Sequence, residues 1–141
     1  MAVVVFSLLF VFFVDSWETS VTSAQKAMKK NRMEFAAVSA TDLLIKSAGS
    51  SNSSNISMAG FATVPYKLSS AKIAQFTALN YSAQKSLLGM QEQFTFYIED
   101  TNGVRLYEGG NLTVYSKVIV SITRYAVLDG NIVKLRVNVY G

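Results

Sequence analysis

The sequence contains no cysteine and no histidine, one proline, and few charged residues, which make up 16% of its 141 positions. Without cysteine the chain has no disulfide, thiolate nucleophile or cysteine-ligated metal site. Without histidine it lacks the commonest metal ligand and general base. We therefore expect no enzyme activity, no catalytic residue, no metal ion, no cofactor and no small-molecule substrate.

The charged residues show neither the clustering nor the spacing of a reactive or nucleic-acid site. The formal net charge is +4, and the cations are spaced singly except between residues 26 and 32. Nucleic-acid binding needs clustered cations, often beside stacking aromatics, so we expect no nucleic-acid partner. Acid–base catalysis needs two carboxylates that converge in a cleft. The spacing of the candidate carboxylates suggests no such cleft: Asp42, Glu92, Glu99, Asp100, Glu108 and Asp129.

Apolar residues, by contrast, make up 50% of the chain, and its mean hydropathy is +0.28. They are densest in residues 1–14, which carry no charge. Such a run is typical of a secretory signal peptide, a buried strand or helix, or a membrane-embedded helix. No cation opens this run and no small-residue cleavage motif closes it, so we favour the membrane helix, with Trp17 at the membrane interface.

The apolar run is short for a membrane span. Fourteen helical residues reach about 21 Å, whereas the hydrocarbon core is about 30 Å thick. We therefore expect the chain to be incomplete upstream of Met1.

The helical pattern continues beyond the apolar run. Residues 15–46 contain neither proline nor glycine, and Lys46 is followed closely by Gly49. Apolar residues recur at intervals near three, four and seven: Val14, Trp17, Val21, Ala24, Met28, Phe35, Val38 and Leu43. We predict one helix over residues 1–46 that is apolar on all sides at first and amphipathic afterwards. From Val21 onward, its apolar face is expected to cover a sheet.

The second half of the chain has a β pattern. Residues 47–60 are rich in serine and asparagine and predict a solvated loop. Residues 61–141 predict a globular, β-rich extracellular domain with a short strand and one or two short helices before residue 90. Four segments with period-two alternation follow, over 93–98, 104–107, 114–128 and 132–140. The predicted fold is α+β, with the long helix packed on a four-stranded antiparallel meander.

This order of elements resembles type IV pilin-like proteins, in particular the archaeal members with a class III signal peptide. The resemblance rests on the apolar helix start and on the run of segments DLLIKSAG from Asp42, GFA from Gly60, LNY from Leu79, LLG from Leu87 and FTFYIED from Phe94. Two features of that family are missing. The given residues include no basic–Gly peptidase site, and the fifth residue is Val5 instead of an acidic residue. Both departures are expected if the chain is incomplete upstream of Met1.

The resemblance implies a pilin-like structural or accessory subunit of a surface filament for adhesion or attachment, with motility as another use. Such a subunit is held in the cell membrane before assembly and then polymerises with other copies of the same chain through the apolar helix. The residues expected to pack between helices are Val3, Val5, Phe6, Leu8, Leu9, Phe10, Phe12 and Phe13. The alternative is a single-pass membrane-anchored extracellular binding or accessory protein that does not polymerise.

Four asparagines begin Asn-X-Ser/Thr sequons and are candidate N-glycosylation sites if the domain is extracellular: Asn52, Asn55, Asn80 and Asn111. Asn52 and Asn55 are the strongest candidates, because their loop is expected to be exposed.

Overall fold

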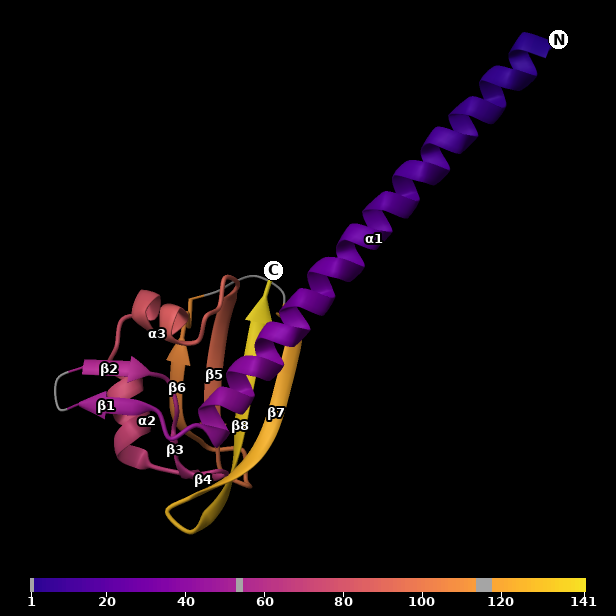
Figure 1. Cartoon of the computed structure of the whole chain (residues 1–141). Helices are drawn as coiled ribbons and strands as arrows, with labels where there is room; N and C mark the ends of the chain where they lie inside the picture. The colour runs from indigo at the N-terminus through magenta and orange to yellow at the C-terminus, as the bar shows by residue number, and fades with distance from the viewer. Residues whose placement is uncertain (1, 53–54, 114–117) are drawn as a thin grey trace. The chain divides into compact units, whose positions relative to one another are not determined.

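The computed structural model describes residues 2–52, 55–113 and 118–141, with backbone alone at 2, 3, 51, 52, 55–57, 118 and 119 (Figure 1). The chain divides into two compact units, Met1–Arg32 and Met33–Gly141. This boundary lies inside the first helix instead of at its end, because the helix contributes buried core residues from Met33 onward.

The predicted long N-terminal helix is confirmed as α1 (Ala2–Lys46). Its first unit, up to Arg32, is helical throughout the described residues and contains neither proline nor glycine. The helix is followed by Ser47 to Gly49, and Gly49 adopts a positive φ of 60°, which glycine tolerates best.

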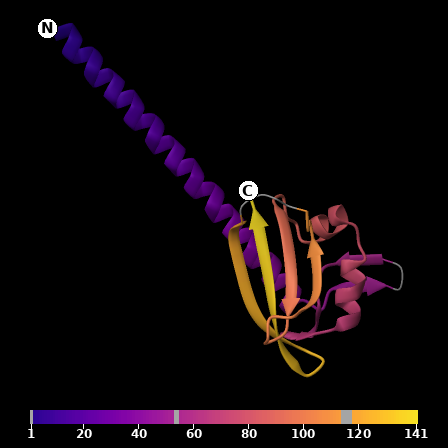
Figure 2. The same cartoon turned by 180° about the vertical axis from the view of Figure 1, so that it is seen from behind.

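The second unit is α+β, as predicted at that coarse level. After α1 it contains, in order, β1 (Ser50–Asn52), β2 (Asn55–Met58), β3 (Ala62–Val64), β4 (Lys67–Leu68), α2 (Ser70–Thr77), α3 (Tyr81–Leu87), β5 (Gln93–Glu99), β6 (Arg105–Gly110), β7 (Val118–Leu128) and β8 (Asn131–Tyr140). Six strands form one sheet in the order β3-β4-β7-β8-β5-β6. The long strands of this sheet curl side by side (Figure 2). Its β4–β7 pair is parallel, so the sheet is mixed.

The predicted four-stranded antiparallel meander is wrong in strand number and strand order, and the parallel β4–β7 pair includes a strand that the prediction did not contain. β8 lies between β7 and β5 and pairs with both, which leaves β6 at an edge. The meander prediction assumed that consecutive strands are neighbours, and this holds for only about two-thirds of sequential strands. Residues 114–117 of the third predicted strand lie outside the described residues.

The predicted loop at residues 47–60 contains a hairpin instead. β1 and β2 pair antiparallel, with Ser51 opposite Ile56 and Asn52 opposite Asn55. The serine and asparagine content favoured a loop, but strand pairing uses backbone groups that composition does not report. At Gly60 the chain passes so close to Ser47 that an added Cβ would lie 2.4 Å from the Ser47 carbonyl oxygen.

The predicted covering stripe of α1 is wrong for most of its residues, although Leu43 packs against the core. The buried helix residues are Met33, Ala37, Ala40, Thr41, Leu44 and Ile45, whereas Phe35 is 76% exposed. Ala37 and Ala40 are 0% and 1% exposed, so the face of α1 that enters the core carries small side chains. The prediction gave most weight to large apolar residues, and these two alanines carry little hydrophobic signal.

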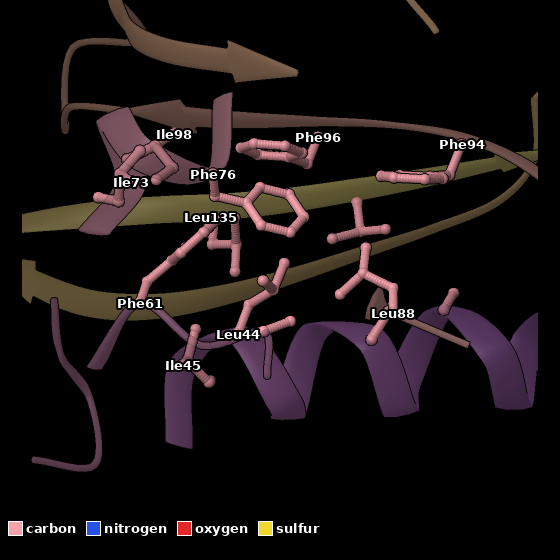
Figure 3. Packing of buried hydrophobic residues seen from close by; sticks show 14 of the residues in the cluster. Leu44, Ile45, Phe61, Ile73, Phe76, Leu88, Phe94, Phe96, Ile98 and Leu135 are labelled. Carbon is pink, nitrogen blue, oxygen red and sulfur yellow. The ribbon is translucent and has the colours of Figure 1, made fainter. Parts of the chain in front are cut away.

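Aromatic rings fill the centre of the core (Figure 3). The ring centroids of Phe61, Phe76 and Phe96 lie 5.3 to 5.8 Å apart, at the distances of favourable tilted pairs. Leu44 and Ile45 reach this cluster from the helix, and Leu135 reaches it from β8 (Figure 3). The second unit therefore has a hydrophobic core of its own.

Candidate functional site

The candidate site is the apolar segment of α1 from Val4 to Val14, which we call the assembly segment. Its predicted packing residues are between 54% and 74% exposed: Val5, Phe6, Leu8, Leu9, Phe10, Phe12 and Phe13. The side chain of Val3, also predicted to pack, lies outside the described residues. Eleven consecutive positions cover every direction around a helix of 3.6 residues per turn. The segment is therefore apolar on all sides.

Among the described residues, α1 is long and apolar enough, by length and composition, to cross a membrane. The first charged residue is Asp15, one position after the assembly segment. Trp17 follows it, 65% exposed, with its ring stacked on Phe13 at a centroid distance of 6.4 Å. An exposed indole beside the first charges fits the position that tryptophan favours at a membrane interface.

Two sequon asparagines have described side chains, and both lie in local hydrogen-bonded turns. Asn80 caps α3, with its Oδ1 accepting from the Ala83 N–H at 2.8 Å. The Oδ1 of Asn111 accepts from both the backbone N–H and the hydroxyl of Thr113. The candidates Asn52 and Asn55 lie in β1 and β2, and their side chains are outside the described residues.

Two carboxylates form ion pairs that bring distant segments together, which the sequence did not reveal. Glu99, 8% exposed, lies 3.9 Å from Nε of Arg105 and 3.5 Å from a terminal nitrogen of Arg136. Asp42 pairs with Lys46 at 2.7 Å and lies 3.8 Å from Arg124 on β7. The three arginines come from β6, β7 and β8, so only the folded sheet places them beside the acids, whereas Lys46 lies one turn from Asp42 on α1. The pairs link elements of the fold and form no acid–base dyad.

A groove of about 560 Å³ lies between the β5–β6 and β7–β8 turns. Asp100, Asn102 and Asp129 line it together with Leu106 and Ile132. Both Asp100 oxygens already accept hydrogen bonds within their own turn. Within the residues that the structure describes, no three histidine, cysteine, aspartate or glutamate side chains could hold a metal ion.

No protein-family model, curated protein or solved structure matches the chain.

Proposed function

We propose that the chain is a structural or accessory subunit of an archaeal type IV pilus-like surface filament that serves in adhesion or attachment. One observation carries the proposal: the assembly segment is uncharged, helical and exposed on every side. The filament requires this segment to occupy two environments, the cell membrane before assembly and the helices of other copies afterwards.

The energetics of burial support such a transfer. Fully burying a large apolar side chain contributes about 1.5 to 3 kcal/mol relative to leaving it in water. The large side chains of the assembly segment include four phenylalanines and two leucines. Their summed burial is large enough to oppose the entropy lost when copies associate. Lipid supplies the same burial to a monomer, so assembly depends on close packing between helices.

The second unit suits the outer part of such a filament. It is a folded α+β unit with its own hydrophobic core, and its sheet carries polar residues between buried ones along β8. The exposed sequon at Asn80 belongs to this unit and is a candidate for glycosylation in the extracellular setting. Intact-mass measurement of protein from its native source tests that modification.

Electron microscopy of filaments sheared from cells that carry the gene tests the proposal. We expect thin filaments whose mass spectrum contains peptides of this chain. A variant with Phe6, Phe10 and Phe13 all changed to Ala is expected to remain in the membrane fraction and to yield far fewer filaments. It loses aromatic packing and keeps an uncharged helix.

The matched control is Phe35→Ala, which removes an exposed aromatic residue from the second unit. It is expected to leave filament number unchanged. A protein that stays monomeric in detergent, in cells whose sheared fraction contains no filaments with this chain, would instead indicate the non-polymerising membrane anchor.

A further inference from the structure

A second exposed apolar surface follows the assembly segment along α1. It consists of Trp17, Val21, Ala24 and Met28, and we call it the seam. Trp17 is 65%, Val21 38% and Met28 72% exposed, and Ala24 is exposed as well. The core of the second unit takes its helix residues only from Met33 onward, so it makes no use of the seam.

We infer that the seam binds the same seam on a second copy of the chain, as a parallel, in-register pair of helices. The spacing of its residues is four, three and four, which is the alternation of a and d positions in a heptad repeat. The same alternation continues backward through Val14 and Phe10 into the assembly segment. A repeat of 3.5 residues keeps one line of side chains facing a partner helix when the two helices supercoil around each other.

The polar residues around the seam fit this arrangement. Lys26, Lys29 and Lys30 fall at the outward f, b and c positions of the heptad, where they remain in water. The flanking e and g positions from Glu18 to Ala27 contain a single charge, so a parallel pair brings no like charges together there.

The parallel direction follows from the assembly segment. A parallel pair places the two uncharged segments at the same end, where one membrane can hold both. An antiparallel pair places them at opposite ends. The inference rests on the proposed function only in that the copies share one membrane, and the pair can form whether or not the copies then polymerise.

Disulfide cross-linking of the full chain in membranes tests the inference directly, because the chain contains no cysteine of its own. Ala24→Cys places one thiol on the seam, and Thr22→Cys places one on an outward face two residues away. Seam thiols in register approach within disulfide range, so oxidation is expected to yield about tenfold more dimer from A24C than from T22C. Equal dimer yields, or no dimer from A24C, would overturn the inference.

A second substitution separates a specific seam from chance collisions. Met28→Asp in the A24C chain puts a charge on the seam and is expected to reduce the dimer yield about tenfold. Lys29→Asp in the same chain changes an outward position and is expected to leave the yield unchanged. When V21C and A24C chains are mixed in equal amounts, random pairing gives about two 21–24 disulfides for each 24–24 disulfide. A ratio well above this value would indicate antiparallel pairing and contradict the register.

The outcome is independent of the filament test. If filaments form while the A24C chain stays monomeric, seam pairing is rejected and the filament proposal stands. If disulfide-linked pairs form and no filaments are found, seam pairing stands and the filament proposal is rejected.

Discussion

At the scale of single residues, Gln84 shows how a buried polar side chain joins separate elements. It is 4% exposed, and its amide nitrogen donates to the Phe76 and Leu79 carbonyls at 3.2 and 2.9 Å. Its amide oxygen accepts from the Gly110 N–H at 2.9 Å. One side chain on α3 therefore satisfies backbone groups around α2 and at the end of β6. In the sequence, Gln84 looks like any other polar helix residue.

Gln84→Leu is expected to lower the free energy of unfolding by about 2 kcal/mol or more. The leucine leaves the Gly110 N–H and two carbonyls without this partner in the core. Circular dichroism during urea unfolding measures the change in the full chain in detergent. Gln91→Leu, at an exposed position, is the control and should change the free energy by less than about 0.5 kcal/mol. Equal effects of the two substitutions would contradict the role of the Gln84 hydrogen bonds.

Tyr81 makes stability depend on pH in the alkaline range. Burial raises the pKa of its phenol, although the hydrogen bond from the Phe94 N–H opposes this rise. Above pH about 10 the unfolded chain loses this proton while the folded chain keeps it, so stability falls as pH rises toward the folded pKa. Below pH about 10 the proton is bound in both states, so Tyr81 no longer makes the free energy of unfolding depend on pH.

Tyr81→Phe is therefore expected to reduce the loss of stability between pH 9.5 and 11, because the titrating group is gone. Thermal unfolding followed by circular dichroism across this range measures the slope. A Tyr81→Phe slope equal to that of the wild type would contradict the prediction.

At the scale of elements, α1 differs from its prediction in the face that it buries. The sequence contains two helical stripes, one with large residues that include Met28 and Phe35, and one with Met33, Ala37, Ala40 and Leu44. The second stripe lies in the core. Periodicity identifies a helix face but does not say which of two faces meets the sheet, because that depends on how closely the backbones can approach.

Leu44→Ala is expected to lower the free energy of unfolding by about 2 to 5 kcal/mol, the usual cost of emptying a buried leucine site. Leu44 is fully buried. Phe35→Ala removes a larger apolar side chain that is 76% exposed and is expected to change stability by less than about 0.5 kcal/mol. Urea unfolding of both variants measures the difference. A larger loss of stability from Phe35→Ala than from Leu44→Ala would indicate that the helix face with Phe35 is the buried one.

At the scale of the whole molecule, the assembly segment is expected to hold the chain in a membrane. Phe10→Asp places a charge inside this segment, and an aspartate at the centre of a membrane helix costs about 2.5 to 3.5 kcal/mol on insertion scales. Carbonate extraction of membranes should release more F10D protein than wild-type protein. Phe35→Asp is the matched control outside the segment, and release of both variants to the same extent would contradict the membrane role.

The sequence by itself determined the long N-terminal helix, the α+β class and the uncharged segment. Each follows from a local feature of the sequence. These features are the absence of proline and glycine from residues 1–46, the change from a helical period to a period of two, and the run of apolar side chains from Val4 to Val14. Only the tertiary structure decided that β8 lies between β7 and β5, that Glu99 meets two arginines, and that α1 buries its alanine face. These contacts join residues far apart in the chain, and they depend on packing and backbone pairing, which local patterns do not specify.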